Sequence, residues 1–310
     1  MEEAPLFSEV ARGPEGGQAF WLRADDGVRL RVGIWARGAR GTVFVFPGRS
    51  EVIEKYGLVA RRIAAEGWGV LTLDWRGQGL SDRLAADGLG HVRRFADYQR
   101  DVAVLSAVAE RVGLAGPWML LAHSMGGCIG LRSLLRGLPV KAAAFSAPMW
   151  GLPLGTATSF AARGLGVMAG LAGRGSRRLP GDRPDFALTG MSFDDNVLTT
   201  DRAMFDYMQA QVRAHPELAL GAPTLGWISS ALAEMRALAR RRSPQLPAYA
   251  AVGTREKVVS IAPIPARMNR WPGGRFEEYP GAEHELMMEA AVHRTRFLDA
   301  ALALFDEAAA

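Results

Sequence analysis

The sequence is short of cysteine, of lysine and of long apolar runs. Cys128 is its single cysteine, which excludes an intrachain disulfide framework and is compatible with a reducing compartment. No run of about 18 uncharged apolar residues occurs, so we expect no membrane-spanning helix. Residues 1–5 are acidic and lack the basic and apolar build of a secretory signal. Together these features predict a cytoplasmic protein, either free or peripheral to the inner membrane face.

Arginine carries nearly all of the positive charge, because lysine occurs only at positions 55, 141 and 257. The 37 Lys and Arg residues against 32 Asp and Glu give a formal net charge of +5 and a pI near 9.8. Such a charge fits attraction to phosphate-bearing surfaces. The local clusters are small, at residues 177–178 and 240–242, which is typical of solvated surface charge. We therefore expect no nucleic-acid partner, and contact with an anionic membrane surface stays open.

Strand and helix patterns alternate along the first part of the chain. Residues 19–36 alternate around an Asp-Gly turn, which indicates an antiparallel hairpin. The apolar runs that follow are typical of strands buried on both faces, and helical patterns separate them. The apolar runs are 42–46, 69–73, 118–122 and 142–145, and the helical patterns are 51–66, 95–112 and 126–135. This alternation predicts an α/β fold with a mostly parallel sheet and helices on both faces.

The strand rhythm stops after residue 147 and resumes at 246–252 and 275–279, before a final helix expected over 286–305. Between them we expect helices at 201–213 and 224–242, and an apolar segment at 152–172 that either covers the active site or packs on the core. The chain is therefore divided into a first core part (1–147), a helical cap (148–243) and a second core part (244–310). Candidates for pocket lining are Met149, Met168, Met191, Met204 and Met208, and candidates for ordinary core are Trp150, Phe160 and Trp227.

A serine lies at the junction between an apolar strand and a helix. The run AHSMGG at residues 122–127 follows the strand, and a helical pattern follows it directly. A nucleophile on such a sharp turn requires small residues two positions away on each side, and Ala122 and Gly126 meet that requirement. The start of the helix also directs backbone N–H groups toward a developing oxyanion. We therefore predict Ser124 as the nucleophile.

One of the five histidines lies where a catalytic base is needed. His284 follows the strand at 275–279 and a Pro-Gly turn, on a loop at the carboxyl edge of the sheet. His123 is expected to face away from the nucleophile, and surface positions are expected for His91, His215 and His293. His284 does not begin a zinc-binding H-E-x-x-H helix, because position 288 is Met. We predict His284 as the base and expect no metal and no cofactor.

The acid should lie between the nucleophile and the base, because the chain order in α/β-hydrolases is serine, acid, histidine. The loop after the strand at 246–252 contains Glu256, and glutamate can take the place of aspartate in such triads. We predict that Glu256 orients His284. The competing carboxylates are Glu283, Asp195 and Asp201.

Five segments together resemble the lysophospholipase L2 and monoacylglycerol lipase branch of the α/β-hydrolases, often grouped with the S33 serine aminopeptidases. They are PGRSE at 47–51, DWRGQGLSD at 74–82, AHSMGG at 122–127, SAPMWG at 146–151 and PGAEHELMME at 280–289. By this resemblance the backbone N–H groups of Arg49 and Met125 form the oxyanion hole, and Arg76 and Asp82 are structural. The chain departs from the family at Glu256, where the family pattern has aspartate.

The resemblance implies hydrolysis of carboxylic esters in single-chain lipids, lysophospholipid or monoacylglycerol, through an acyl-enzyme intermediate. The alternatives are an aminopeptidase or a C–C bond hydrolase on the same triad, and a relative that binds a ligand without catalysis. An aminopeptidase requires an acidic pocket for the free amine, which the sequence does not show. Serine at the elbow excludes dehalogenases and epoxide hydrolases, because those enzymes place aspartate there.

Overall fold

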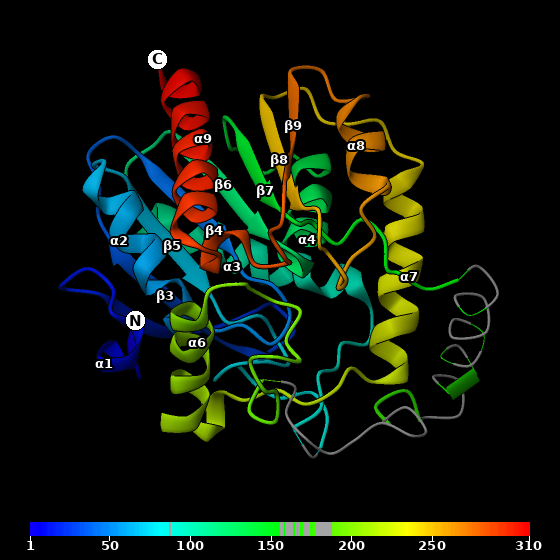
Figure 1. The fold of residues 1–310 in the computed structure, drawn as a ribbon. Helices are drawn as coiled ribbons and strands as arrows, with labels where there is room; N and C mark the ends of the chain where they lie inside the picture. The colour runs from blue at the N-terminus through cyan, green and yellow to red at the C-terminus, as the bar shows by residue number, and fades with distance from the viewer. Residues whose placement is uncertain are drawn as a thin grey trace.

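The sheet of the computed structural model runs through the middle of the molecule (Figure 1). The structure describes residues 1–310 except 87, 156–157, 159–163, 165, 167, 170–173 and 178–187. Within the described residues, nine strands form one sheet in the order β1-β2-β3-β5-β4-β6-β7-β8-β9. Antiparallel pairs link β1 (Glu2–Ala4), β2 (Gln18–Arg23), β3 (Arg29–Ala36) and β5 (Gly69–Leu73). Parallel pairs link β5 to β4 (Thr42–Phe46), then β6 (Trp118–His123), β7 (Ala143–Ser146), β8 (Ala248–Gly253) and β9 (Gly274–Tyr279).

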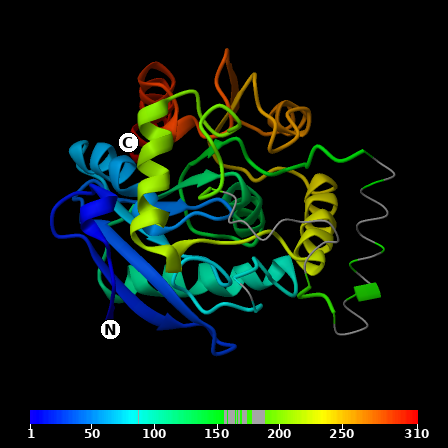
Figure 2. The same ribbon diagram turned by 60° about the horizontal axis from the view of Figure 1, so that its bottom comes forward.

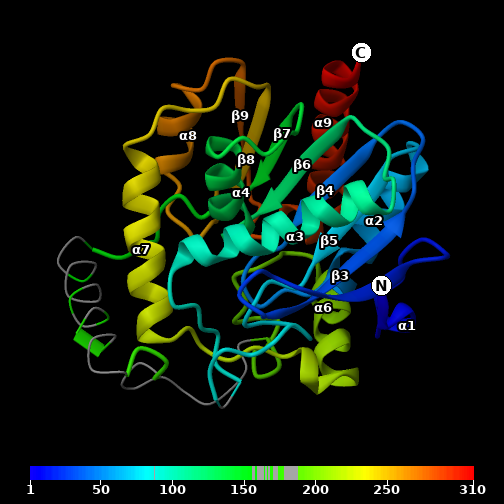
Figure 3. The same cartoon turned by 180° about the vertical axis from the view of Figure 1, so that it is seen from behind.

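Helices cover both faces of this sheet, as predicted (Figures 1 and 3). On one face lie α2 (Gly57–Ala65) and α9 (Ala291–Ala309), and on the other lie α3 (Tyr98–Arg111) and α4 (Met125–Leu135). Strand β4 shows why its sequence is apolar throughout: Val43 and Val45 enter one apolar cluster, and Phe44 and Phe46 enter the other. Among the described residues, no helix is long and apolar enough to cross a membrane.

The expected helix over residues 286–305 is wrong at its start. Residues Leu286–Met288 form a 3-10 turn, Glu289 is extended, and α9 begins only at Ala291. The reason is the buried carboxylate of Glu289, which accepts the backbone N–H groups of Glu283 and Ala290, each at 2.8 Å. Residues 286–290 therefore form part of a loop, and the helix begins after them. The helices expected from 51 and 95 also open with 3-10 turns, Ile53–Tyr56 and Phe95–Asp97.

Two long helices of the predicted insertion, α6 (Arg202–Ala214) and α7 (Leu225–Ala239), lie between β7 and β8 in the chain (Figure 2). The side chain of Asp201 accepts two backbone N–H groups at the start of α6, and Thr224 accepts one at the start of α7. Most of the apolar segment at 152–172, with Phe160, lies outside the described residues. The division into core and cap stays a prediction.

The residues expected to be structural make polar contacts with other segments of the chain. Arg76 pairs with Asp26 and Asp101 at 2.7 Å, and an Asp82 carboxylate oxygen accepts the backbone N–H of Arg29 at 2.7 Å. Trp150 and Trp227 are both buried in an apolar cluster, as expected of core residues.

Candidate active site

Ser124 lies at the turn between β6 and α4, and its backbone is strained. Its φ of 49° and ψ of −116° are values that L-residues rarely adopt. Gly126 makes the turn possible, because a Cβ atom there would lie 2.1 Å from the carbonyl oxygen of Phe46 at the end of β4. The backbone N–H of Ser124 donates to the carbonyl of Ser146 at 3.0 Å. The turn is thus held between two neighbouring strands at the carboxyl edge of the sheet.

The side chains predicted as nucleophile, base and acid form one chain of hydrogen bonds. Ser124 Oγ lies 3.0 Å from His284 Nε2, and His284 Nδ1 lies 2.7 Å from Glu256 Oε2. The other carboxylate oxygen, Oε1, accepts the backbone N–H groups of Val258 at 2.6 Å and Val259 at 3.0 Å. Burial works to raise the pKa of Glu256, but His284 and the two N–H groups lower it overall. The Glu256 side chain is therefore ionised, with both oxygens engaged.

The loops after β8 and β9, which carry the acid and the base, are bonded to each other. The backbone N–H groups of Thr254 and Arg255 donate to the carbonyls of Tyr279 and Ala282 at 3.0 and 2.9 Å. A Cβ atom at Gly253 would lie 2.2 Å from the Ala282 carbonyl oxygen, so glycine is required for this close approach. The acid and the base are held on one rigid pair of loops.

A segment of the insertion, residues 198–200, supports the loop of the base. The backbone N–H of Glu285 donates to the carbonyl of Leu198 at 2.8 Å. Thr200 donates its backbone N–H and its hydroxyl to the Glu289 carboxylate at 3.1 and 2.6 Å. The loop of the base is therefore bonded both to the loop of the acid and to the insertion.

The two backbone N–H groups expected in the oxyanion hole belong to the loop after β4 and to the start of α4. Met125 is the first residue of α4, where N–H groups have no acceptor inside the helix. The loop at Arg49 is held by Gln78, whose Nε2 donates to the carbonyls of Gly48 at 3.0 Å and Glu51 at 3.1 Å. The N–H of Gly48 donates to the Glu51 carboxylate, within the loop itself. The oxyanion role of Arg49 and Met125 stays a prediction.

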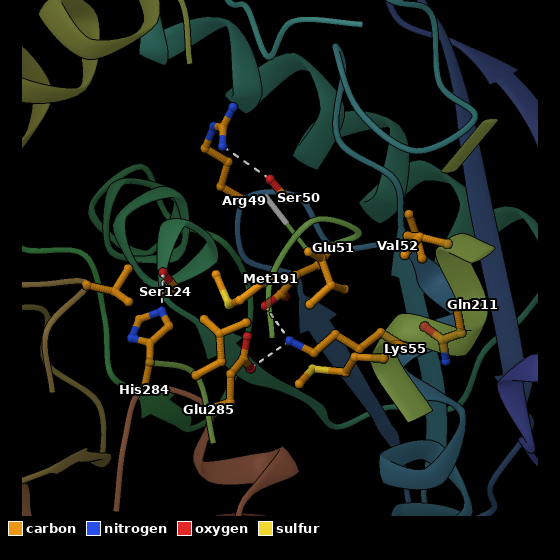
Figure 4. A pocket seen from close by; sticks show the side chains of 15 residues that line it. Arg49, Ser50, Glu51, Val52, Lys55, Ser124, Met191, Gln211, His284 and Glu285 are labelled. Atoms are coloured by element: carbon orange, nitrogen blue, oxygen red, sulfur yellow. Dashed lines mark hydrogen bonds and ion pairs between the residues drawn. The ribbon is translucent and has the colours of Figure 1, made fainter. Parts of the chain in front are cut away.

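A pocket of about 210 Å³ opens beside Ser124 and His284 (Figure 4). One part of its wall is apolar and comes mainly from residues 188–212, and the other part is charged. The apolar residues are Val52, Leu188, Met191, Leu198, Met208, Val212 and Val258, and the charged ones are Arg49, Glu51, Lys55 and Glu285. The pocket thus presents an apolar and a polar region to one bound molecule.

The methionines expected to line the pocket fall into three groups. Met191 and Met208 line it. Met149 and Met204 are buried without lining it, and Met168 is 68% exposed. The expectation of a methionine lining is therefore right for two of the five positions.

A buried cluster of four titratable side chains, Glu51, Lys55, His123 and Glu285, lies beside the base and was not predicted. Lys55 Nζ lies 2.6 Å from both Glu51 Oε1 and Glu285 Oε2. His123 Nε2 lies 3.1 Å from the same Glu285 oxygen, and its ring centroid is 4.7 Å from that of His284. None of the four side chains is more than 6% exposed. His123, expected to face away from the nucleophile, therefore packs against the ring of the base.

In this cluster, attraction between opposite charges shifts the pKa values more than burial does. Burial works to lower the pKa of Lys55 and of His123, but the carboxylates of Glu285 and Glu51 raise both overall. Burial works to raise the pKa of Glu285, but His123 and Lys55 hold it well below its usual range. Glu51, His123 and Glu285 have the spacing of a metal site, and the Lys55 ammonium already contacts its carboxylate oxygens. Lys55 therefore supplies the positive charge that these acids need.

The sequence contained a signal for this cluster. Glu51 and Lys55 are four residues apart, the spacing of an ion pair on a helix. His123 and Glu285 are the direct chain neighbours of the nucleophile and the base. Four titratable side chains in these places indicate a charged site, although only the folded chain shows that they meet.

The remaining histidines lie away from the triad. His91 Nδ1 lies 2.7 Å from Thr224 Oγ1, and burial lowers the pKa of His91. His215 pairs with Glu9 at 2.8 Å. His293 is half-buried on α9. All three were expected at the surface, and all three are half-buried.

The carboxylates that compete with Glu256 are engaged elsewhere. Glu283 pairs with Arg255 at 3.2 Å, and burial raises the pKa of Glu283. Asp201 caps α6, and Asp195 accepts the Ser192 hydroxyl at 2.7 Å. Of the carboxylates in the described part of the chain, Glu256 alone is bonded to the imidazole of the predicted base.

Comparison with known proteins shows similarity in both sequence and fold. The family model described as serine aminopeptidase, S33, matches residues 37–291. Lysophospholipase L2 from Escherichia coli (strain K12) is 34% identical over 313 residues, covering 93% of this chain and 89% of that protein. A monoacylglycerol lipase from Mycolicibacterium smegmatis is 33% identical over 105 residues, which cover 33% of this chain and 36% of that protein. A soluble variant of monoglyceride lipase from Saccharomyces cerevisiae has a TM-score of 0.69 at 18% identity, covering 94% of this chain and 96% of that chain. The predicted α/β-hydrolase fold is confirmed.

Proposed function

The chain belongs to the serine aminopeptidase S33 family, and from this premise we propose that it hydrolyses carboxylic esters of single-chain lipids, lysophospholipid or monoacylglycerol. The observation that carries the proposal is the chain of hydrogen bonds from Ser124 through His284 to Glu256, at the mouth of a pocket with an apolar wall. A relative that aligns with 93% of this chain is named a lysophospholipase.

In the proposed mechanism, His284 Nε2 takes the hydroxyl proton while Ser124 Oγ attacks the ester carbonyl carbon. The backbone N–H groups of Arg49 and Met125 stabilise the tetrahedral oxyanion. Glu256 holds the Nδ1 proton and stabilises the imidazolium. His284 then protonates the leaving alcohol, and the same imidazole activates the water that hydrolyses the acyl-enzyme. These steps use only the residues of the chain and water.

The pocket supports a single-chain substrate. Its volume of about 210 Å³ is below the range of roughly 300 to 1,000 Å³ in which proteins enclose drug-sized ligands. Such a space accepts part of one acyl chain, on the side formed by Met191, Leu198 and Met208. The charged wall then faces the polar head of the lipid.

The charged wall also favours ester hydrolysis over aminopeptidase activity. An aminopeptidase needs an unpaired carboxylate to bind the free ammonium of its substrate. The acidic residues that line the pocket in the described part of the chain are Glu51 and Glu285. Lys55 contacts both of them at 2.6 Å, so neither carboxylate is left without a positive partner.

We further assign residues 148–243 to a cap above this pocket, since Leu188, Leu198, Met208 and Val212 contribute to its wall. The net charge of +5 supports peripheral contact with an anionic membrane surface, where lipid esters are available.

The first experiment is labelling with an alkyl fluorophosphonate. We expect covalent modification of Ser124, and Ser124→Ala should abolish both labelling and esterase activity. Labelling that persists in Ser124→Ala would place the nucleophile elsewhere, for example at Ser146. A chain that neither labels nor hydrolyses esters would be a ligand-binding relative without catalysis.

The second experiment compares substrates at equal concentration. We expect turnover of lysophosphatidylcholine or monoacylglycerol, little turnover of diacyl phosphatidylcholine, and none of amino-acid anilides. Comparable rates on one-chain and two-chain phospholipids would refute the single-chain assignment, and release of the anilide would favour the aminopeptidase.

A further inference from the structure

Arg267, on α8 (Pro263–Met268), is a buried cation with no negatively charged partner in the described part of the chain. The residue is 3% exposed. Its guanidinium donates to the carbonyl of Leu238 and to Ser243 Oγ, and its Cζ lies 5.8 Å from the centre of the Trp150 ring. No carboxylate of the described residues lies within ion-pairing distance of it. The contacts that this cation makes with described residues are therefore with neutral groups.

Such an arrangement is unlike the other buried arginines of the described chain. Arg31 contacts two carboxylates at 2.7 Å, and Arg76 does the same. Burial works to lower the pKa of Arg31, but its carboxylates raise it overall, whereas burial and the neighbouring Arg270 both lower the pKa of Arg267. Leu238 lies in the last turn of α7, where the helix dipole supplies only about half a negative charge. A buried charge without a full counter-charge is costly, so an anion bound at this place would be stabilised.

A cavity of about 180 Å³ lies against Arg267. Figures 1 and 3 show α8 beside the C-terminal end of α7, and the cavity lies between these helices and α4. Its wall is mostly apolar, with Leu131, Trp150, Met235 and Pro263 among the lining residues. It shares no lining residue with the pocket beside Ser124.

The arginine side of this cavity adjoins a second, basic depression. Arg270 lines both spaces, and the second one, of about 260 Å³, is also lined by Ser243, which is bonded to Arg267. The remaining lining includes the run Arg240 to Arg242. Two arginines thus line the mostly apolar cavity, and three more line the depression that shares Arg270 with it.

We propose that this place, the Arg267 site, binds an amphiphilic anion: a carboxylate or phosphate group carried on a short apolar chain. The anionic oxygens accept charge-assisted hydrogen bonds from Arg267 and Arg270, and the apolar chain fills the space beside Trp150. The run at 240–242 attracts the anion electrostatically. The cavity volume limits the apolar part to a short chain.

Calorimetry and thermal unfolding with hexanoate, hexyl phosphate, acetate and 1-hexanol test the Arg267 site. We expect hexanoate or hexyl phosphate to raise the melting temperature and to bind about tenfold or more tightly than acetate, because each added methylene contributes. The alcohol should have no such effect. Preference for hexyl phosphate identifies a phosphate head, and preference for hexanoate identifies a carboxylate.

Three variants separate this site from the pocket beside Ser124, which also accepts alkyl chains. Arg267→Met should abolish the anion-dependent stabilisation, and it should fold, because an apolar side chain of similar length replaces an unpaired charge. Arg270→Gln, at an exposed residue, should weaken binding about tenfold. The control Arg23→Gln makes the same charge change at an exposed site on β2 and should behave like wild type.

An equal rise in melting temperature for wild type, Arg267→Met and Arg270→Gln would overturn the proposal. So would binding to anionic vesicles alone, without binding of free hexanoate or hexyl phosphate, since that result describes a charged surface and no discrete site. Neither outcome would bear on ester hydrolysis, which is measured separately with Ser124→Ala.

Discussion

Replacing Glu256 with glutamine should move the proton of the neutral His284 ring from Nδ1 to Nε2. The Oε1 atom of Glu256 accepts the N–H groups of Val258 and Val259, so the glutamine carbonyl must take this position. The amide nitrogen then faces His284 Nδ1, 2.7 Å away in the wild type, and donates a hydrogen bond to it. His284 consequently carries its proton on Nε2, toward Ser124, and cannot accept the serine proton.

The expected fall in kcat has two causes: the loss of the carboxylate charge and the wrong tautomer of His284. An imidazolium and a carboxylate with charge centres about 4 Å apart attract each other by about 4 kcal/mol at an effective dielectric constant of 20, or roughly 10³ in rate. The wrong tautomer adds to this, and the equivalent change in a serine protease lowers kcat by about 10⁴. We expect kcat of Glu256→Gln to fall by about 10³ to 10⁴ with little change in KM.

Steady-state kinetics on a soluble short-chain ester, with urea unfolding as a check on the fold, measures this effect. Glu256→Asp is the matched variant: it keeps the charge but shortens the side chain by one methylene, so it should recover part of the activity. Wild-type kcat in Glu256→Gln would refute the assignment of the acid. Loss of activity in a Glu283→Gln variant alone would assign the role to that residue.

Further substitutions test the surroundings of the site. Lys55→Met removes one of the two cations that face the buried carboxylates of Glu51 and Glu285, and should lower the free energy of unfolding in urea by about 3–5 kcal/mol. A loss below about 1 kcal/mol would contradict the proposed charge balance. Gly126→Ala places a Cβ atom 2.1 Å from a carbonyl oxygen and should prevent soluble folding, whereas Gly155→Ala has space and should express like wild type. The raised pKa of His123 contributes stability below about pH 6.5 that is lost as the pH rises through its folded pKa, and the lowered pKa of Glu285 contributes stability above about pH 4.5 that is lost in acid. We therefore expect the plot of unfolding free energy against pH, measured in urea from about pH 2 to pH 9, to be flatter on its alkaline side in His123→Phe and flatter below about pH 4.5 in Glu285→Gln. Unchanged profiles would exclude these groups as the cause.

The sheet and the triad geometry could be predicted because they rest on local signals. Strand β4 was predicted with its observed bounds, since an apolar run between turn residues permits little else. The structure brings Ser124, His284 and Glu256 together because the parallel strands before them all end at one edge of the sheet. Their catalytic roles stay proposals until the labelling and kinetic experiments are done.

The features that the sequence analysis missed depend on contacts between distant segments. The Glu289 carboxylate, whose local contacts delay the start of the last helix, also accepts from Thr200, and nothing in the sequence near Glu289 shows that distant contact. Lys55 and Glu285 are separated by more than two hundred residues, and their ion pair exists only after β4 and β9 are placed in one sheet. No feature of the sequence singles out Arg267, which is buried only by the packing of the folded chain.

The hydrogen bonds between residues 198–200 and the loop of the base affect how this family can be engineered. An exchange of residues 148–243 with the matching block of a relative would be one way to change substrate preference. In this chain the exchange would also change the backbone path at Leu198, whose carbonyl accepts from Glu285, and could remove the hydroxyl of Thr200; both contacts hold the loop that carries His284. A chimera that keeps 198–200 and replaces the remainder would test specificity alone, whereas one that removes these residues would also loosen the base and lose rate on every substrate.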